Sequence, residues 1–506
     1  MLTTVAKNSF FVFLARIVDV ISVFLLIFLI ARYLTQQFGL ASFGQYGFIT
    51  TFVTFLFSLG YAGISQITIR EVAQNREQAS RYLRASLLLR SGLSFCLIAL
   101  IAFFAFFIRH ETAGIFWAII LMAISETLSI LSLSFLDILN AHELMHYDTV
   151  STLLYRLTTL VITIIAILLK GSLWYFFFAI VIATLLKAVF LFAIYRKKIS
   201  KQQVPHREPT FGLRAITLRL PLRYLAIQAA PIALAFLITQ AYMKTGVLFL
   251  RGLSTSEQIA LFYAPLRLLF QFQFIPFALS MALFPVFSRV AKTDNPDDIP
   301  RLSQQKDLSN LFIRAFRFSV ILCVPVIVIF LLLAEPIMLL IFGDKFKAAV
   351  PCLQILMISF PVTFLELLMN NFLITIKRQK LILICNTLCL ATNLGLNILL
   401  IPRYGAIGAS WATSIAYLVL FFAFFYFVRQ FTGAKLLLAT FPKPILAGLG
   451  MALALYFTHN INWIIFGLLS FAIYLVFIYG LKGVTPGEIR TIKSILKPYG
   501  KADYTD

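Results

Sequence analysis

Residues 10–30 combine the length of a membrane-spanning helix with two charged side chains, Arg16 and Asp19. About 20 apolar residues are needed to cross a bilayer as a helix. A charged side chain inside such a helix costs about 2.5–3.5 kcal/mol on insertion scales, so an ionisable residue there indicates a functional site. The spacing of three residues places both charges on one helical face. We therefore expect this face to point away from lipid, towards a partner or a water-filled cavity.

Charged residues also fall inside other predicted spans, and together they number nine. Left unpaired, they would cost roughly 20–30 kcal/mol, which exceeds the stability of about 5–15 kcal/mol of a whole fold. They must therefore pair with one another or face water. Five are cationic, and the full set is Arg16, Asp19, Glu126, Asp137, Arg156, Lys187, Lys244, Arg267 and Glu366.

The composition is that of a polytopic helical membrane protein. The 506 residues are 61% hydrophobic and 12% charged, whereas soluble domains are roughly 45–50% apolar and 25% charged. The first apolar stretch is too long for a cleavable signal peptide and is interrupted by charges, so we expect it to remain as the first helix. The cysteines lie in or beside apolar stretches and suit packing better than metal or disulfide chemistry; they are Cys96, Cys323, Cys352, Cys385 and Cys389.

Hydropathy predicts an all-α membrane protein with about fourteen spans. The predicted centres are Ile21, Phe55, Ile98, Ile124, Val161, Ile182, Ala235, Ile275, Val326, Thr363, Leu390, Val419, Leu453 and Tyr474.

The net charge of +23 would suggest a nucleic-acid partner in a soluble protein, but here the basic residues gather in alternate loops, so no nucleic acid is expected. The positive-inside rule places these loops and both termini in the cytoplasm. One loop on that side, residues 140–149, has no Lys or Arg and departs from the rule. The basic clusters lie in residues 70–90, 196–223, 289–317, 377–380, 429–443 and 482–501.

A basic linker, residues 199–221, divides the chain into two lobes of six helices each. The predicted N-lobe is residues 1–198 with helices 1–6, and the predicted C-lobe is residues 222–430 with helices 7–12. An even number of spans in each half is what a parallel repeat requires. Residues 431–506 contain helices 13 and 14, which we expect to form an accessory pair, and a basic cytoplasmic tail.

Several segments resemble the polysaccharide-export flippases of the multidrug/oligosaccharidyl-lipid/polysaccharide exporter superfamily, the group that includes Wzx-type O-antigen flippases. Their order and spacing over about 400 residues carry the resemblance. The segments are FGQYG at 43–47, REVA at 70–73, YAPLR at 263–267, LFPVFSR at 283–289, IFGD at 341–344 and LIPRYGAIGA at 400–409.

This resemblance implies a multi-pass carrier of the inner (plasma) membrane with two six-helix lobes around a central cavity. Such carriers move undecaprenyl-pyrophosphate-linked oligosaccharide from the cytoplasmic to the outer leaflet by alternating access, for surface polysaccharides such as O-antigen, capsule or exopolysaccharide. The implied partners are the lipid-linked substrate, the membrane, and the polymerase and glycosyltransferases of the same pathway. No enzymatic activity is implied.

A pyrophosphate headgroup brings negative charge and many acceptor oxygens, which guanidinium groups bind in a bidentate fork. We therefore predict that Arg16 and Arg267 bind it, with Lys244 and Arg156 as further contacts. Relatives that move lipid-linked cell-wall precursor also carry cavity arginines in helices 1 and 8, so the resemblance supports the first two. The alternative is that each cation has a structural partner, Arg16 with Asp19 and the others with Glu126 or Glu366.

Three carboxylates are candidates for coupling transport to H⁺ or Na⁺, because buried carboxylates can shuttle protons; they are Asp19, Glu126 and Glu366. Structural pairing is the alternative for them as well. We predict Pro231 in helix 7 as a hinge, since proline removes a backbone hydrogen bond and can kink a spanning helix. No other cofactor is expected.

The string HELMH at residues 142–146 matches a zinc-protease pattern but has no obvious third protein ligand except Asp148, so we interpret it as a solvated loop without a metal. Two other functions compete with a flippase. A cation-coupled drug exporter of the same superfamily should have an acidic cavity, whereas these spans are net basic. A polysaccharide polymerase or ligase needs a substantial outward loop or an acidic catalytic cluster, and the outward loops here are short.

Overall fold

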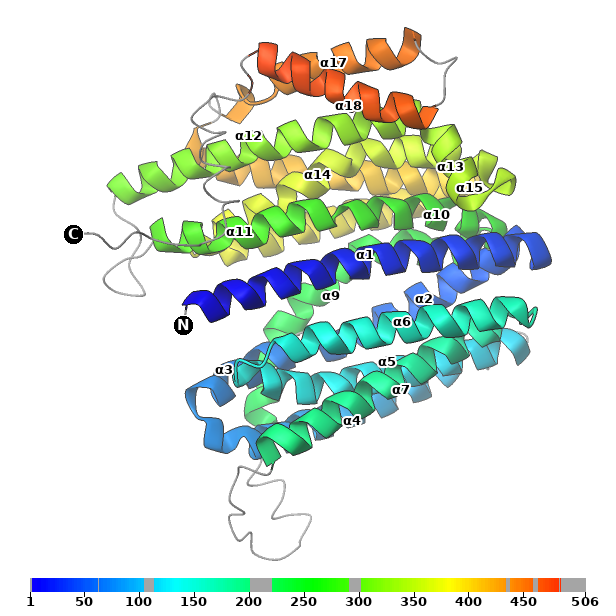
Figure 1. Ribbon diagram of the computed structural model, residues 1–506, viewed down its shortest axis with the longest axis vertical. Coiled ribbons are helices and arrows are strands. Elements are labelled where there is room, and N and C mark those ends of the chain that lie inside the picture. The colour runs from blue at the N-terminus through cyan, green and yellow to red at the C-terminus, as the bar shows by residue number, and fades with distance from the viewer. Residues whose placement is uncertain are drawn as a thin grey trace, which may run out of the picture. The chain divides into compact units, whose positions relative to one another are not determined.

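A computed structural model (Figure 1) describes residues 2–61, 63–103, 113–200, 221–290, 302–433, 437–457, 463–481 and 483. Every regular element within these ranges is a helix. Contacts divide the chain into an N-terminal unit, Lys7–Ala260, and a C-terminal unit, Leu261–Asp506 with Met1–Ala6.

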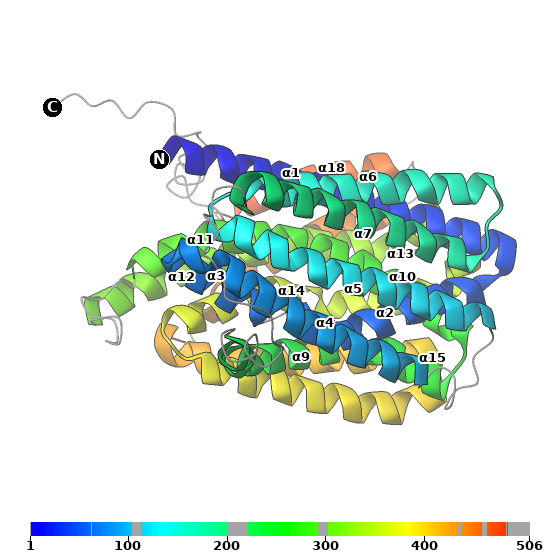
Figure 2. The same cartoon turned by 90° about the horizontal axis from the view of Figure 1, so that it is seen from below.

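The N-terminal unit is a bundle of long helices and shorter connecting ones. Figure 2 shows α4, α5 and α7 running side by side, and α6 packs against α7. In chain order the elements are α1 (Leu2–Phe38), α2 (Leu40–Tyr61), α3 (Ile64–Gln74), η1 (Arg76–Gln78), α4 (Ala79–Phe103), α5 (Ala113–Ala141), α6 (His146–Leu168), α7 (Leu173–Tyr195), η3 (Arg196–Ser200) and α9 (Leu222–Leu253).

The next helix, α10 (Ser256–Phe272), begins in the N-terminal unit and continues into the C-terminal one. The remaining elements of the C-terminal unit are α11 (Phe274–Val290), α12 (Leu302–Leu332), α13 (Ala334–Phe342), η4 (Asp344–Ala349), α14 (Val350–Thr375), α15 (Gln379–Thr432), α17 (Pro442–Phe457) and α18 (Trp463–Gly480).

Eleven helical segments in the described part of the chain are long and apolar enough to cross a membrane. One of them, α15, has 54 residues and is kinked at Gly405 (φ 53°, ψ −126°), so it supplies two of the predicted spans. Two shorter apolar helices, Pro442–Phe457 and Leu469–Gly480, contain the last two predicted centres. The predicted all-helical membrane fold is confirmed, and the cytoplasmic placement of the termini stays a prediction.

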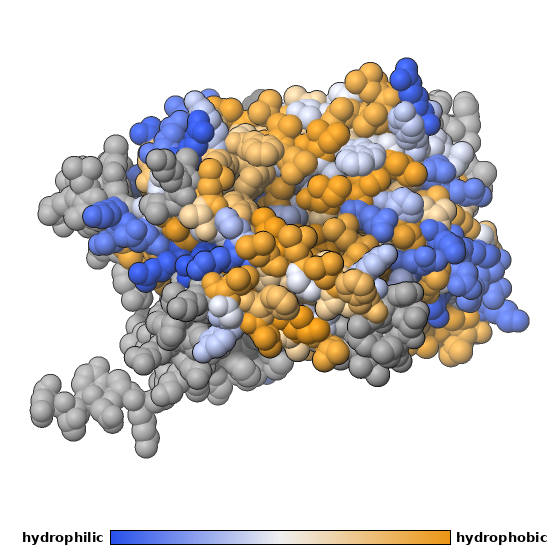
Figure 3. Space-filling model, turned by 90° about the horizontal axis from the view of Figure 1, so that it is seen from above, coloured by the Kyte–Doolittle hydropathy of each residue, from blue (hydrophilic) through white to orange (hydrophobic). Residues whose placement is uncertain are grey.

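One surface of the molecule shows the polarity pattern of a membrane protein. In Figure 3 hydrophobic residues gather over the middle of the face, and hydrophilic residues lie towards its two ends. Such an apolar band is what hydrocarbon contact requires.

Helix α9 belongs to the N-terminal unit by its contacts, because it packs against α2, α3 and α4. The compact unit therefore ends at Ala260, later in the chain than the N-lobe boundary at residue 198 that the linker suggested. Helix α9 comes close to Gly63 (φ +80°), between α2 and α3, where a β-carbon would lie 2.4 Å from the carbonyl oxygen of Ala229. Only glycine combines this backbone conformation with such a close contact.

Proline divides the predicted eighth span into two helices. Pro276 has no N–H to donate to the carbonyl of Phe272, and α10 ends at that residue before α11 begins at Phe274. The missing donor and the ring clash account for the break. The span centred on Ile275 is therefore not one continuous helix.

The C-terminal helix pair packs on α12 of its own unit (Figure 1). Met451 of α17 and Tyr474 of α18 join Ile321 in a buried apolar cluster. The Tyr474 hydroxyl donates to the carbonyl of Ile321 at 2.8 Å, so its polar end is satisfied within the cluster. The position on the outside of α12 fits the accessory role expected from the lack of charge in these two helices.

The start of α2 is fixed against the turn between α9 and α10 by Gly44. A β-carbon there would lie 1.7 Å from the backbone oxygen of Ser256. We expect Gly44→Ala to force these segments apart and lower the free energy of unfolding by about 1–3 kcal/mol, the usual range for overpacking. Thermal unfolding of the purified protein in detergent measures the change.

The matched control is Gly92→Ala, because a β-carbon at Gly92 in α4 would meet nothing within 4 Å. Alanine has the higher helix propensity, so this variant should be as stable as the natural protein or slightly more so. Equal melting temperatures for both variants would contradict the close packing at Gly44.

Candidate functional site

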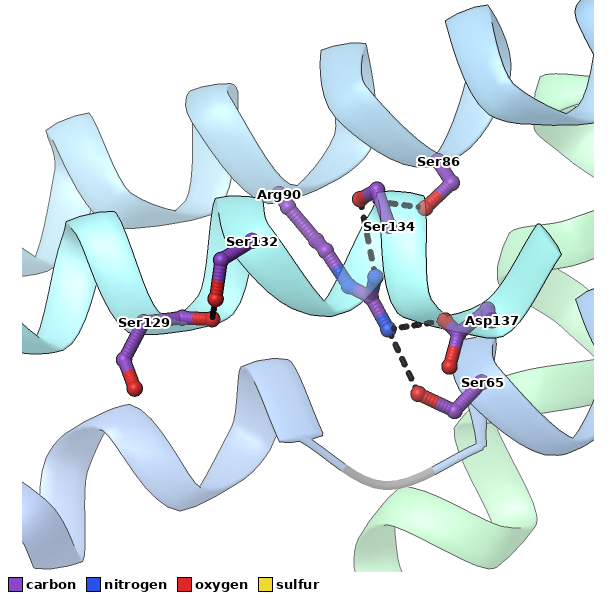
Figure 4. A network of polar contacts seen from close by, with 7 residues as sticks. All are labelled: Ser65, Ser86, Arg90, Ser129, Ser132, Ser134 and Asp137. Atoms are coloured by element: carbon purple, nitrogen blue, oxygen red, sulfur yellow. Dashed lines mark hydrogen bonds and ion pairs between the residues drawn. The ribbon is translucent and has the colours of Figure 1, made fainter. Parts of the chain in front are cut away.

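The most deeply buried ion pair joins Arg90 of α4 to Asp137 of α5 (Figure 4). The Arg90 side chain is 0% exposed, and its Nη2 donates to an oxygen of Asp137 at 3.0 Å and to Ser65 of α3 at 2.7 Å. Its Nη1 donates to Ser134 at 2.8 Å, and Ser134 is hydrogen-bonded to Ser86. This network fastens three helices together through hydrogen bonds to one guanidinium.

The assignment of Arg90 to a cytoplasmic basic loop at residues 70–90 was wrong. Arg90 lies inside α4 with no exposed side-chain surface. Arg90 is buried there because the buried carboxylate of Asp137 needs a cation close by. The signal in the sequence was that lone carboxylate in a predicted span, together with the hydroxyl residues Ser86 and Ser134.

A second ion pair brings together two predicted site residues, Asp19 and Arg156. The Nε of Arg156 in α6 donates to an oxygen of Asp19 in α1 at 2.5 Å, and both side chains are mostly buried. The guanidinium also lies over the ring of Tyr155, 5.2 Å from its centre. Lys187 of α7 interacts electrostatically with Asp148 of α6 and with both members of the pair.

The predicted partner of Asp19 was Arg16, and the predicted structural partner of Arg156 was Glu126 or Glu366. Arg16 lies in α1, outside the side chains that the structure describes, so its pairing and its binding role stay predictions. Arg156 has a structural partner in Asp19, and its binding role stays a prediction.

A third group lies where α2, α5 and α9 meet. Glu126 of α5 is 9% exposed and accepts a hydrogen bond from the Tyr61 hydroxyl at 2.6 Å. Lys244 of α9 donates to the hydroxyl of Thr54 in α2 at 2.9 Å. Lys244 also interacts electrostatically with Glu126. Helices α2, α5 and α9 thus each contribute to one charged cluster.

Tyr155 connects the second and third groups. Its side chain interacts electrostatically with Arg156 and Asp19 of the second group and with Glu126 of the third. We call the combined set the polar chain, and it carries three cations and three carboxylates, a net charge of zero. Its members are Asp19, Tyr61, Glu126, Asp148, Tyr155, Arg156, Lys187 and Lys244.

Arg267 differs from Arg90 and Arg156, which each form an ion pair. It lies in α10 of the C-terminal unit, over the ring of Tyr263 at 5.6 Å. Its Nε is buried without a hydrogen-bond partner. None of the ion pairs in the described part of the chain includes Arg267, which leaves its positive charge available to an anion.

Glu366 of α14 faces buried residues of α15. It interacts electrostatically with Cys385, Cys389 and Tyr417. Both cysteines are fully buried, in keeping with packing roles. The same stretch of α15 carries Asn393 and Asn397, which hydrogen-bond to each other at 2.8 Å.

The sequence analysis did not single out this asparagine pair as a polar feature. Asn393 and Asn397 are 1% and 0% exposed, and Asn386, one heptad before Asn393, is also buried. Their spacing of seven and four residues places all three on one face of a helix. That spacing was the available signal.

The HELMH string forms the turn between α5 and α6. Glu143 has a left-handed backbone conformation (φ 63°) and pairs with Arg76 at 3.0 Å. The two histidines therefore do not lie on one continuous helix, as the protease pattern requires. Within the described residues no three His, Cys, Asp or Glu side chains gather as metal ligands do.

Pro231 lies inside α9, which runs without interruption from Leu222 to Leu253. It follows the contact of Ala229 with Gly63 by two residues. Its role as a hinge stays a prediction.

Helices of this length, arranged in two units with buried charges, are typical of membrane transporters. The fold is similar to that of the lipid II flippase MurJ in an inward closed conformation, with a TM-score of 0.72 and 17% identity over 93% of this chain and 97% of that one. It is also similar to an inward-facing multidrug resistance MATE family transporter of the MOP superfamily, with a TM-score of 0.61 and 14% identity over 84% and 99% of the two chains. At these identities the likeness establishes the fold.

The sequence identifies the family. Residues 5–291, more than half of the chain, match the family described as "Polysaccharide biosynthesis protein", and the protein belongs to it. An uncharacterized membrane protein of Methanocaldococcus jannaschii is 26% identical over 229 residues. That match spans 44% of this chain and 43% of the relative. The resemblance seen in the sequence motifs is thereby confirmed.

Replacing one member of the Arg90–Asp137 pair should lower the free energy of unfolding far more than replacing both members with apolar residues. Arg90→Met alone leaves a carboxylate buried without a cation, and we expect a loss of about 3–5 kcal/mol in unfolding free energy. The double variant Arg90→Met/Asp137→Leu should recover much of that loss. Denaturant-induced unfolding in mixed micelles compares the variants.

Arg76→Ala is the control, because it breaks an exposed pair with Glu143 and should leave stability nearly unchanged. A double variant no more stable than Arg90→Met would contradict the assignment of the loss to an uncompensated charge.

Proposed function

We propose that the protein is a flippase that moves undecaprenyl-pyrophosphate-linked oligosaccharide from the cytoplasmic to the outer leaflet of the plasma membrane. It works by alternating access and serves the biosynthesis of a surface polysaccharide. The family and the transporter fold support this class of activity. The excess of intramembrane cations supports an anionic headgroup as the part of the cargo that the protein binds.

The single observation that carries the proposal is the charge balance at the buried sites. The charged residues of the predicted spans, with Arg90 added, are six cations and four carboxylates. Among the described residues Arg90 and Arg156 form ion pairs, and Arg267 does not. A pyrophosphate group has the acceptor oxygens that guanidinium and ammonium groups bind most strongly. In this proposal Arg16, Arg156, Lys244 and Arg267 bind the headgroup.

Coupling to H⁺ or Na⁺ would use Asp19, Glu126 or Glu366, and Pro231 would absorb the bending of α9. The chain would act beside the polymerase and glycosyltransferases that make and use the same lipid-linked sugar. These roles follow from the transport proposal.

The second candidate is a cation-coupled exporter of drugs or small molecules, and the fold it shares with a MATE family transporter favours it. A cationic drug needs a net negative site, however, and the six charges of the polar chain sum to zero. A polymerase or ligase is the weaker alternative, because the proteins of similar fold named above are a flippase and a transporter.

Deletion of the gene is expected to trap lipid-linked oligosaccharide in the cytoplasmic leaflet and abolish the surface polysaccharide. The physical reason is that a charged, sugar-bearing headgroup crosses hydrocarbon very slowly without a polar path. Mass spectrometry of the accumulated lipid-linked sugars and staining of surface glycan measure the two effects. Complementation with Arg16→Ala or Arg267→Ala should fail although the protein reaches the membrane.

Arg403→Ala serves as the control for arginine loss, because Arg403 is exposed; it should complement fully. Normal surface glycan in the deletion strain, with no second flippase present, would reject the proposed function. Full complementation by both Arg16→Ala and Arg267→Ala would instead reject the binding residues.

A further inference from the structure

Two side chains of α2 form hydrogen bonds with oppositely charged side chains of two other helices. The Thr54 hydroxyl accepts a hydrogen bond from Lys244 of α9, and the Tyr61 hydroxyl donates one to Glu126 of α5. Seven residues separate Thr54 from Tyr61, which places them on the same face about 10 Å apart along the axis. The side chains of Lys244 and Tyr61 are each several ångströms long, so the ammonium and the carboxylate lie within range of each other's charge.

The surroundings make this charge interaction strong. Glu126 is 9% exposed, and the polar chain lies among membrane-spanning helices. At low effective dielectric, unit charges several ångströms apart interact far more strongly than in water. Any anion that approaches Lys244 is therefore repelled by Glu126 while it is attracted by the lysine.

The Tyr61 hydroxyl fixes the position of the Glu126 carboxylate, from which the repulsion comes. It donates its hydrogen to the carboxylate, which anchors Glu126 and disperses part of its negative charge. Without the hydroxyl, the carboxylate would be free to turn towards Lys244 and would carry its full charge. Tyr61 and Glu126 therefore act on Lys244 in opposite directions.

We propose that Glu126, anchored by Tyr61, is the resident counter-ion of Lys244 and sets how tightly an anionic headgroup binds there. The inference rests on the proposed function, since it takes a polyprenyl pyrophosphate as the ligand. A carrier must release its cargo after each passage, and an internal competitor keeps binding weak enough for release. Tyr61 and Glu126 are positioning residues, because they act through Lys244.

The test is equilibrium binding of farnesyl pyrophosphate to the purified protein in detergent, with farnesol as the uncharged comparison. Glu126→Gln keeps the size and the hydrogen-bond acceptor for Tyr61 but removes the charge. It should bind farnesyl pyrophosphate about three- to tenfold more tightly, the scale of coupling between neighbouring charged groups. Farnesol binding should not change.

A double-mutant cycle assigns the gain to Lys244. Lys244→Met should weaken farnesyl pyrophosphate binding, and Glu126→Gln should give no gain in the Lys244→Met background. Tyr61→Phe keeps the ring and should weaken binding about twofold, opposite in sign to Glu126→Gln. A merely structural role for Glu126 would weaken binding in both variants.

Glu335→Gln is the matched control, because it removes the same charge from an exposed pair with Lys347 and should leave binding unchanged. Unchanged or weaker binding of farnesyl pyrophosphate by correctly folded Glu126→Gln, while the natural protein binds it, would overturn the counter-ion and leave the flippase proposal standing. A gain that persists without Lys244 would also overturn it. Absence of binding by the natural protein would overturn the anion site and the inference together.

Discussion

Charged side chains inside an apolar helix bundle must find opposite charges, and this requirement organises the N-terminal unit. Arg90 with Asp137 joins the consecutive helices α4 and α5, and Arg156 with Asp19 joins α6 to α1, which is distant in sequence. A buried cation without a counter-ion would cost several kcal/mol, a large share of any fold's stability. The pairs therefore specify which helices are neighbours as well as satisfying the charges.

The buried cations differ in how much of their positive charge is available to a ligand. Arg90 donates to Asp137, Ser65 and Ser134, so its charge serves the structure. In the polar chain, three cations are balanced by three carboxylates, and the Tyr61 hydroxyl of α2 donates to one of them, Glu126 of α5. Arg267 lies over the ring of Tyr263 and belongs to none of the ion pairs among the described residues. Its positive charge suits an anionic headgroup.

The sequence predicted the spans well because membrane insertion depends on local hydropathy. It misplaced Arg90 because a charge near the end of a span looks like a loop residue until its partner is known. The break before Pro276 was missed as well, since proline leaves open whether a helix bends or ends. Asp19 and Arg156 were both recognised as candidates, but their pairing over 137 residues of sequence depends on tertiary packing that spacing does not encode.

The most direct measurement is the transbilayer movement of undecaprenyl-pyrophosphate-linked oligosaccharide in liposomes that contain the purified protein. Access of an external lectin to the sugar reports how much lipid has reached the outer leaflet, without a gradient and under imposed H⁺ and Na⁺ gradients. A carrier for this lipid should expose the sugars of the inner leaflet much faster than protein-free liposomes do, and Arg267→Ala should slow that exposure. Equal rates with and without the natural protein under every gradient would contradict the proposal that the protein carries this lipid.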